Sequence, residues 1–568
     1  MSCRLLFALV AAVPALAGWI RLDSPHFELY TDAGPGRGRS ILERLELVRH
    51  AFAGAPGAPV LGPLPVRVLL LASSGAFRPL RPSESTLGFF QGGPERNYIV
   101  LHWAGEQTER VAAHEYVHLL LNHTTVALPR WLEEGTAEFY STLRAEGDSL
   151  AVGAPIFTHL QTLRRTRWLD ASTLAAVTRD SPFYHQPDKA ALFYAQSWAL
   201  VHMLNLSEGY RGALPRFVEL LDRGTPAAFE QAFGKTLEAA LEDLERYVAA
   251  GRFMVIRIPL EPLGNPNVTG PRPVPEEESL LVRAELLLDM GSEEEAARLY
   301  RRLAAADPDS PAVHTGLGAL ALRRGDYAAA RQHLARALAL GDAGARTHFE
   351  YAMLLRDSGE TPAEVLAALR KAVALNPQFA EAHFMLGGAL LKDGRRAEAV
   401  AHLQKAASLL PRQSSLWHAL ALALHEAGRT EEARRAAWRA LEAAATSAEE
   451  EMARAALRKI GEPQPTRQPD RSPMVPPSWQ PAKGQAVAGE LIQVDCLGHA
   501  ARLYVRVERR TIALLIGRPS QVRIRNAPAG RLDLRCGPQA SARAVVEYVP
   551  RSDPRYGTDG DVIAIELQ

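Results

Sequence analysis

A repeat of about 34 residues between residues 277 and 447 limits most strongly what this chain can fold into. Each unit has the length of one helical hairpin, and a single hairpin cannot bury its own apolar face. The units therefore have to stack into an elongated solenoid. Small residues recur where the helices of a unit touch, and prolines close the units: Leu317-Gly318, Leu386-Gly387, Ala330, Ala399, Pro308, Pro377 and Pro411.

This pattern resembles the tetratricopeptide repeat. The resemblance implies five units within residues 277–460, and a polar capping helix at 448–460. It also implies a concave surface for a protein or peptide partner, with a rigid spacer as the alternative. The expected units are 277–310, 311–344, 345–379, 380–413 and 414–447.

A second motif, His-Glu-Tyr-Val-His, supplies candidate chemistry. His114 and His118 are four residues apart, so a helix places them on one face, one turn apart. Two imidazoles in this arrangement bind a zinc ion, and Glu115 then lies beside the metal, where it takes a proton from a bound water. The alternative is an ordinary buried helix whose histidines are hydrogen-bonded in the core.

Two carboxylates further along the chain complete a predicted zinc site. A catalytic zinc needs a third protein ligand and one open position. Glu134 follows His118 by 16 residues, at the start of an expected second helix, and Glu138 lies four residues later on the same face. We expect Glu134 to bind the metal and Glu138 to orient a histidine ring from behind.

The stretch Trp131–Ala137 resembles the gluzincin metallopeptidases, the group that includes thermolysin and aminopeptidase N. Those enzymes often carry the third ligand within Trp-Leu-x-Glu-Gly-x-Ala, and this chain has Glu134 at the ligand position. Glu138 falls where thermolysin-like members have an acidic residue bonded to the first histidine. Tyr194, 60 residues after Glu134, is near the position of the aminopeptidases' catalytic tyrosine, which implies a hydrogen bond to the oxyanion. A core aromatic residue is the alternative for Tyr194.

The resemblance covers residues 20–255 and departs from aminopeptidase N at one place. That enzyme group uses a Gly-x-Met-Glu-Asn strand to hold the free amine of the substrate. The nearest stretch here, Gly92–Asn97, lacks the methionine and contains an extra arginine, so we expect a turn before the strand Tyr98–Leu101. Endopeptidase and exopeptidase specificity both stay open, and the closer likeness is to the peptidase MA-like group of secreted bacterial proteins.

Residues 18–257 are predicted to form the peptidase domain. Residues 18–105 alternate between strand and helix patterns, and residues 155–250 are helical. In gluzincins, an edge strand ahead of the zinc helix binds the extended substrate backbone. Four further histidines are expected to be surface or hydrogen-bonded residues rather than ligands: His123, His159, His185 and His202.

The N-terminus predicts export. Residues 1–17 contain Arg4, an apolar run and the small-residue sequence Ala15-Leu16-Ala17, as in a cleaved signal peptide. The mature protein is then periplasmic or secreted, with an uncleaved N-terminal anchor as the alternative. No other stretch reaches about eighteen uncharged apolar residues, so we expect no transmembrane segment in the mature chain. The net charge of +1 and the lack of a dense basic segment argue against a nucleic-acid partner.

Two proline-rich stretches, 258–276 and 461–486, are predicted to be linkers. Residues 487–568 contain short alternating strands separated by turn residues, which indicates a small β-barrel or β-sandwich. Cys496 and Cys536 remain after removal of the signal peptide, and in an exported protein this pair suggests one disulfide. Two buried free thiols are the alternative.

These features predict a multidomain α+β protein: a gluzincin-like zinc peptidase domain, a solenoid of tetratricopeptide repeats and a small all-β C-terminal domain. The leading hypothesis is a zinc metallopeptidase that hydrolyses peptide or protein substrates and uses the repeats to recruit a protein partner or client. The alternative is an inert interaction scaffold in which the repeats carry the function. The intact Glu115 favours the enzyme, because a purely structural metal site has no use for that carboxylate.

Overall fold

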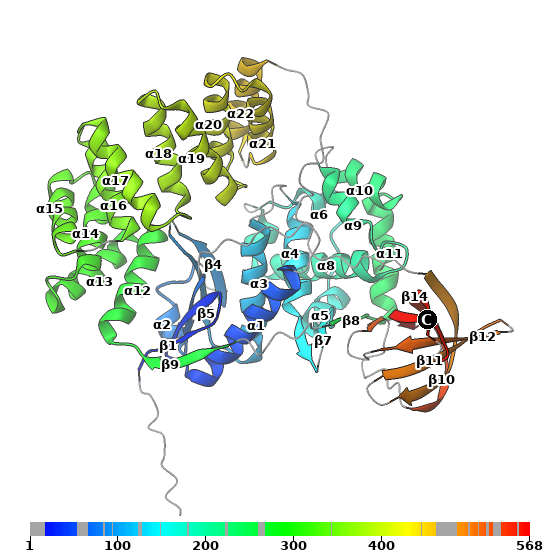
Figure 1. Cartoon of the computed structure of the whole chain (residues 1–568). Coiled ribbons are helices and arrows are strands. Elements are labelled where there is room, and N and C mark those ends of the chain that lie inside the picture. The colour runs from blue at the N-terminus through cyan, green and yellow to red at the C-terminus, as the bar shows by residue number, and fades with distance from the viewer. Residues whose placement is uncertain are drawn as a thin grey trace, which may run out of the picture.

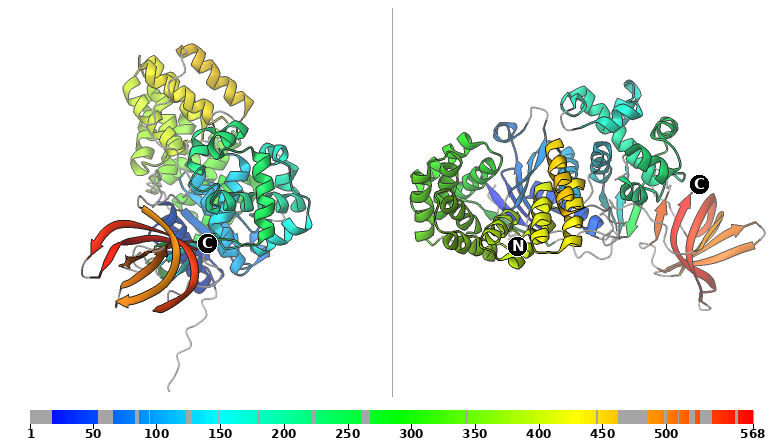
Figure 2. Two further views of the ribbon diagram at one scale, coloured as in Figure 1. Left: turned by 90° about the vertical axis from the view of Figure 1, so that its right-hand side faces the viewer. Right: turned by 90° about the horizontal axis from the view of Figure 1, so that it is seen from above.

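The computed structural model has three parts: an N-terminal mixed α/β region, a helical array and a small C-terminal β-barrel (Figure 1). The barrel and the array project from opposite sides of the α/β region (Figure 2). The predicted signal peptide and residues 462–484 of the second predicted linker lie outside the described residues. The structure describes residues 18–53, 66–82, 86–93, 95–122, 128–147, 149–178, 181–221, 225–259, 267–341, 344–444, 446–461, 485–497, 500–508, 510–517, 522–525, 536–553 and 556–567.

The N-terminal region is built on a six-stranded mixed sheet in the order β4-β5-β3-β2-β1-β9. β2, β3 and β5 run parallel, whereas β1, β4 and β9 are antiparallel to the strands beside them. β4 is therefore an edge strand. The strands are β1 (Ile20–Asp23), β2 (Phe27–Thr31), β3 (Val66–Leu71), β4 (Gly88–Gly92), β5 (Asn97–His102) and β9 (Thr269–Pro273).

Both faces of this sheet are covered, which explains why every residue of β3 is buried. On one face, Val68 shares a core with α1 (Pro35–Ala53) and with α3 (Glu106–Asn122), the helix that carries the zinc motif. On the other face, Leu69 shares a core with the first helices of the array. The sheet therefore lies between the candidate site and the repeats.

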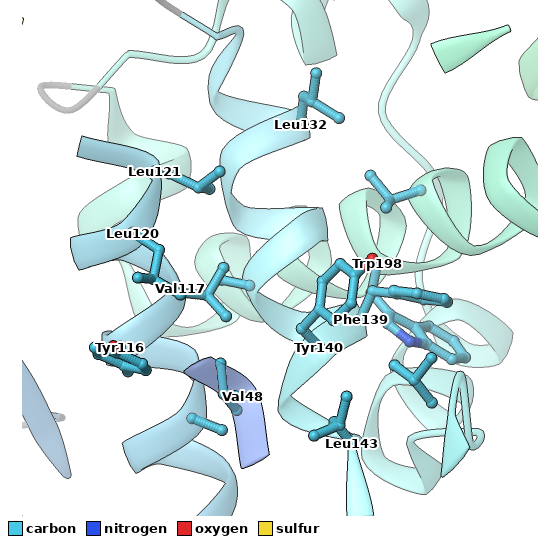
Figure 3. Packing of buried hydrophobic residues seen from close by; sticks show 14 of the residues in the cluster. Val48, Tyr116, Val117, Leu120, Leu121, Leu132, Phe139, Tyr140, Leu143 and Trp198 are labelled. Atoms are coloured by element: carbon cyan, nitrogen blue, oxygen red, sulfur yellow. The ribbon is translucent and has the colours of Figure 1, made fainter. Parts of the chain in front are cut away.

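The helix α3 packs with α4 (Arg130–Ser141) and α8 (Pro187–Leu206) around one hydrophobic core (Figure 3). Contact between α4 and α8 is so close that Gly135 has no room for a side chain. A Cβ atom there would lie 2.3 Å from the carbonyl oxygen of Ser197. The motif Trp-Leu-x-Glu-Gly thus needs its glycine for packing, and this packing positions the neighbouring Glu134.

Part of the predicted linker 258–276 is folded, contrary to expectation. β8 (Ile256–Pro259) pairs with β7 (Ser149–Val152) in a small sheet, and β9 pairs with β1. Prolines are tolerated in β9 because it lies at a sheet edge, where only one side of the strand needs partners. Residues 260–266 lie outside the described residues. The remaining elements of this region are α2 (Ser74–Phe77), β6 (Arg144–Glu146), α5 (Phe157–Arg165), α6 (Ala171–Ala176), α7 (Pro182–His185), α9 (Leu214–Glu219), α10 (Thr225–Phe233) and α11 (Leu237–Ala250).

The array consists of successive helical hairpins followed by α22 (Ser447–Ile460). The recurring glycines mark the closest approach within a hairpin. A Cβ on Gly318 would lie 2.6 Å from Leu334 Cγ, and one on Gly387 would lie 2.6 Å from Leu403 Cγ. The helices are α12 (Glu276–Asp289), α13 (Glu293–Ala306), α14 (Pro311–Arg323), α15 (Tyr327–Ala339), α16 (Ala345–Asp357), α17 (Pro362–Leu375), α18 (Ala380–Lys392), α19 (Arg396–Leu409), α20 (Ser414–Glu426) and α21 (Thr430–Glu442).

The first hairpin of the array packs directly on the sheet. Leu287 of α12 belongs to the same hydrophobic core as Leu69 of β3. Arg67 of β3 forms ion pairs with Glu28 of β2 at 2.9 Å and with Glu285 of α12 at 3.0 Å. The α/β region and the beginning of the array are therefore one packed unit.

Two histidine pairs connect the helices of two hairpins. The Nδ1 atoms are 3.0 Å apart in His314–His333 and 2.9 Å apart in His383–His402. In each pair, Nε2 of the first histidine bonds the carbonyl oxygen of a proline that closes the preceding unit. Burial, together with the positive charges of His402 and Lys405, lowers the pKa of His383 to about 4.

We expect the array to lose stability as the pH falls from about 7 to about 5. The pKa of His383 is about 4 in the folded chain, whereas an unfolded histidine titrates near about 6.5, so acid protonates the unfolded chain first. The stability is complete above the unfolded pKa and falls by about 1 kcal/mol by pH 5, after allowance for solvent screening. The midpoint of urea unfolding, followed by helical circular dichroism, measures this loss. An equal shift in the variant His383→Gln/His402→Gln would contradict the assignment.

The C-terminal domain is a small barrel with the strand order β12-β11-β10-β14-β15-β13, closed by pairing between β12 and β15. A disulfide joins Cys496 in β10 to Cys536 beside β14. The barrel contacts the α/β region through Arg211 and Glu566, which are 2.6 Å apart. The strands are β10 (Gln485–Leu497), β11 (Ala500–Val507), β12 (Arg510–Ile516), β13 (Arg523–Arg525), β14 (Gly537–Asp553) and β15 (Thr558–Leu567).

In the part of the chain that the structure describes, no helix combines the length and the apolar character needed to cross a membrane.

Candidate metal centre

Three side chains from two helices converge beside the edge of the sheet. His114 and His118 come from α3, and Glu134 comes from α4. The Nε2 atoms of the histidines are 3.0 Å apart, and Glu134 Oε2 is 3.1 Å from His118 Nε2 and 3.4 Å from His114 Nε2. Among the described residues, this is the one group of at least three His, Cys, Asp or Glu side chains spaced to hold a metal ion.

This donor set fits a zinc ion. Ligand atoms placed tetrahedrally about 2.0–2.1 Å from an ion are separated by about 3.3 Å. The donor separations of 3.0, 3.1 and 3.4 Å agree with that value. Two imidazole nitrogens and one carboxylate oxygen are also the ligands of known catalytic zinc sites, and they leave a fourth position open. Glu134 is fully buried, whereas the His118 side chain is 21% exposed, so the centre is open to solvent on the histidine side.

Glu138 holds His114 from behind. Its Oε1 is 3.4 Å from His114 Nδ1, and its Oε2 lies 3.2 Å from His159 Nε2 and 3.0 Å from Arg110 Nη2. A carboxylate at Nδ1 fixes the ring so that the Nε2 lone pair faces the metal position. Burial opposes the charge of Glu138, but His159, His114 and Arg110 together lower its pKa to about 2. Glu138 is therefore an anion at neutral pH.

Two tyrosines border the centre. The Tyr184 hydroxyl, on the short helix α7, donates a hydrogen bond to Glu134 Oε1 at 2.7 Å. This bond leaves Glu134 Oε2 turned toward the histidines. The Tyr194 ring, on α8, lies 6.1 Å from the His114 ring and 6.2 Å from the Tyr184 ring. Burial and the charge of Glu134 raise the pKa of both hydroxyls, so both stay protonated and act as donors.

Glu115 lies between the three donors and the edge strand. Its Oε2 accepts a hydrogen bond from the backbone amide of Phe90 in β4 at 3.0 Å. Phe89 and Gln91 pair with β5, so the alternation of an antiparallel ladder turns the Phe90 amide to the outer edge of the sheet. Burial raises the pKa of Glu115, with the two histidines acting in the opposite direction.

The electrostatic field of the centre favours a cation. Burial opposes a proton on His114, but the hydrogen bond to Glu134 and the charges of Glu138 and Glu115 raise its pKa to about 9. The same carboxylates would stabilise a metal ion placed between the donors.

Glu133, the residue before the predicted ligand, connects the centre to the array. Its carboxylate is only 3% exposed and pairs with Arg130 of the same helix. Arg412, in the connection between α19 and α20, places Nη2 2.7 Å from Glu133 Oε1. A helix that carries a candidate metal ligand is thus held from two sides.

The structure places His114, His118, Glu134, Glu138 and Glu115 in one cluster, with Tyr194 at its border. Sequence reasoning missed Tyr184, His159 and Arg412. These residues reach the cluster from 50 positions after Glu134, 21 after Glu138 and 279 after Glu133, and no local spacing marks them. Of the other histidines, His202 is buried between Tyr247 and Gly153, while His123 and the His185 side chain lie outside the described residues.

Comparison with known proteins identifies the array. Residues 281–345 and 350–414 match the family model of the tetratricopeptide repeat, so the array consists of tetratricopeptide repeats. No curated protein matches the chain.

Several solved structures are similar to part of the chain. One is MamA, which is 24% identical, with 28% of this chain and 93% of that chain covered and a TM-score of 0.25. A second is YrrB, described as a tetratricopeptide-repeat protein with an unusual peptide-binding site, at 20% identity, 32% and 90% coverage and a TM-score of 0.26. A third is PilF of Pseudomonas aeruginosa, at 20% identity, 32% and 88% coverage and a TM-score of 0.29.

Proposed function

We propose that this chain is an exported, zinc-dependent peptidase with a gluzincin-type catalytic domain, and that the repeats serve the same activity. The observation that carries the proposal is the convergence of His114, His118 and Glu134 on one point, with Glu115 between them and an edge strand. The export part rests on the signal-peptide pattern of residues 1–17.

His114, His118 and Glu134 would hold the zinc ion. When bound, zinc supplies a water whose pKa is lowered to about 7 and polarises the carbonyl oxygen of the substrate. Glu138 keeps the His114 ring in the orientation that presents Nε2. Tyr184 engages Glu134 Oε1 and so keeps Oε2 available as a ligand atom.

Glu115 is the proposed proton carrier. The Phe90 amide binds one carboxylate oxygen and fixes the group beside the metal position. The carboxylate takes a proton from the attacking water and later delivers it to the leaving amine of the peptide bond. The resemblance to aminopeptidases assigns the oxyanion bond to Tyr194. The hydroxyl of Tyr184 is engaged by Glu134, which also favours Tyr194 for this role.

The outer edge of β4 is the proposed binding surface for the substrate backbone. Among the described strands, β4 pairs with β5 alone. The backbone groups of Gly88 and Gly92 face the same outer edge as those of Phe90, so an extended peptide can add as a further strand. Endopeptidase and exopeptidase cleavage both remain compatible with this surface.

A second candidate function is an interaction scaffold whose repeats bind a protein partner while the metal centre is inert. The match of the array to the tetratricopeptide repeat supports it. The two candidates differ in the variant Glu115→Gln: partner capture and an unchanged cellular phenotype in this variant would favour the scaffold.

The zinc content of the purified chain tests the enzyme proposal. We expect close to one zinc ion per wild-type chain and far less in Glu134→Gln, because a three-ligand site loses its only carboxylate ligand. Glu146→Gln is the matched control, because Glu146 pairs with surface arginines away from the centre. A wild-type chain without zinc after reconstitution would overturn the proposal and leave the scaffold.

A further inference from the structure

The turn between β4 and β5 is inserted into the array. A Cβ atom on Gly93 would lie 2.8 Å from Asp289 Oδ2 at the end of α12. Glu95 Oε1 accepts a hydrogen bond from the backbone amide of Arg346 at 2.9 Å, near the start of α16. Arg346 Nη1 is in turn 2.9 Å from Asp289 Oδ1. The end of the proposed substrate strand is therefore fixed to the third repeat.

The array returns to the catalytic region at a second point. Arg412, between α19 and α20, pairs with Glu133 on α4 at 2.7 Å. Figure 1 shows the array leaving the sheet at α12 and curving so that its later helices stand over α3 and α4. The helices α16 to α20 thus span the distance between the end of β4 and the helix of Glu134.

These contacts close a ring around the candidate centre. The ring runs from β4 through Glu95 and Arg346 to α16, along the array to Arg412, and through Glu133 to α4. It is completed inside the centre, where Glu134 lies near the histidines of α3 and Glu115 binds the Phe90 amide of β4. We call this set of contacts the contact ring.

The inner face of the array inside the ring has a defined composition. Arg346, the second residue of α16, faces inward, because it binds Asp289 and lies against the β4–β5 turn. The equivalent residues of α18 and α20 are Glu381 and Ser415, and positions three, seven and ten residues later continue the same helix face. Those positions are Phe384, Gly388, Leu391, His418, Leu422 and His425.

This inner face contains atoms that await a ligand. Phe384, Leu391 and Leu422 are apolar side chains that remain partly exposed. The Nδ1 atoms of His418 and His425 are buried and have no hydrogen-bond partner among the described residues. Apolar side chains with interspersed donors and acceptors suit the side chains and backbone of an extended peptide.

We propose that the occupant of the contact ring is a single extended segment of an unfolded polypeptide substrate, bound to β4 on one side and to α18 and α20 on the other. A folded domain is too wide for a space between one strand and the helices opposite it. The ring opens at the Arg412–Glu133 pair, because that end is held by ion pairs alone, whereas the other end shares a hydrophobic core with the sheet. This inference rests on the proposed function, since it names the substrate class of the same site.

Association with fluorescein-labelled β-casein, an unfolded protein, tests the ring without requiring cleavage. The parent is the full-length, zinc-loaded Glu115→Gln variant. Adding Arg412→Glu places like charges together and holds the ring open, so we expect association about tenfold faster. Arg429→Glu is the matched control, because Arg429 pairs only within its own helix turn, with Glu432, and its association rate should equal that of the parent. Equal rates for the parent and Arg412→Glu, at equal zinc content, would overturn the ring.

A second variant tests the inner face. Leu422→Gln removes one apolar contact, so we expect about tenfold weaker binding of β-casein. Leu375→Gln is its control, because Leu375 is 40% exposed at the end of α17. In the Glu115 background, Leu422→Gln should shorten β-casein recognition while cleavage of a hexapeptide by the active form stays unchanged. An effect of Leu422→Gln no larger than that of Leu375→Gln would place the substrate elsewhere.

The two proposals fail in different ways. A chain that lacks zinc and cleaves nothing, yet binds β-casein with the predicted response to Arg412→Glu and Leu422→Gln, would sink the peptidase and support the ring. Zinc-dependent cleavage with no response to either substitution would support the peptidase and overturn the ring.

Discussion

Replacing Glu115 by Gln is expected to lower the rate of peptide hydrolysis by about 10²–10⁴-fold, the usual contribution of a positioned general base. An amide cannot take the proton of the attacking water at neutral pH. The amide oxygen can still accept the hydrogen bond of the Phe90 backbone, so the local structure should persist. Hydrolysis of unfolded β-casein and zinc per chain, measured on the same preparations, give the two numbers.

Zinc content separates a chemical effect of this substitution from a structural one. We expect the Glu115→Gln chain to keep the zinc content of the wild type, because Glu115 is not among the three donors. Glu106→Gln, an exposed position in the first turn of the same helix, should leave both zinc and hydrolysis unchanged. If hydrolysis persisted at the wild-type rate in Glu115→Gln, another group would have to be the base.

Replacing Gly135 by Ala is expected to destabilise the α/β region by about 3 kcal/mol and to weaken zinc binding by about 10–100-fold. The added methyl group would lie 2.3 Å from the carbonyl oxygen of Ser197 and 2.6 Å from a methyl group of Val201. The first of these neighbours is backbone, so α4 and α8 have to move apart. Glu134 is adjacent in sequence and moves with α4.

Thermal unfolding and competition with a zinc chelator measure these two effects. Gly388→Ala is the matched control, because Gly388 is also helical but has no atom within 4 Å of the Cβ position. Alanine is the better helix former, so this control should gain up to about 1 kcal/mol. Equal behaviour of the two variants would show that close helix packing does not explain the glycine of the motif.

Local sequence patterns predicted the parts of the site that lie on two helices. His114 and His118 share a helix face by spacing alone, and the Trp-Leu-x-Glu-Gly pattern marked Glu134. The recurring glycines of the array could be assigned in the same way, because they report contacts inside one hairpin. Such features depend on residues that are close in the chain.

Features that depend on distant residues could not be predicted. Tyr184 lies on a helix of four residues, too short for any periodic signal, and meets Glu134 only in the folded chain. Glu285 reads as an ordinary surface charge of a helix, yet it binds Arg67, which is 218 residues away. The prolines of 258–276 indicated a linker, because the sequence does not show that a sheet edge accepts them.

The shared core between the sheet and the first repeat has a consequence for experimental dissection of the protein. A fragment that ended before α12 would leave Leu69, Tyr98 and Val100 without their cover and expose an apolar sheet face to water. Such a fragment would aggregate, and an isolated array would carry the complementary sticky surface. The catalytic region and the repeats should therefore be expressed, purified and exchanged between homologues as a single cassette.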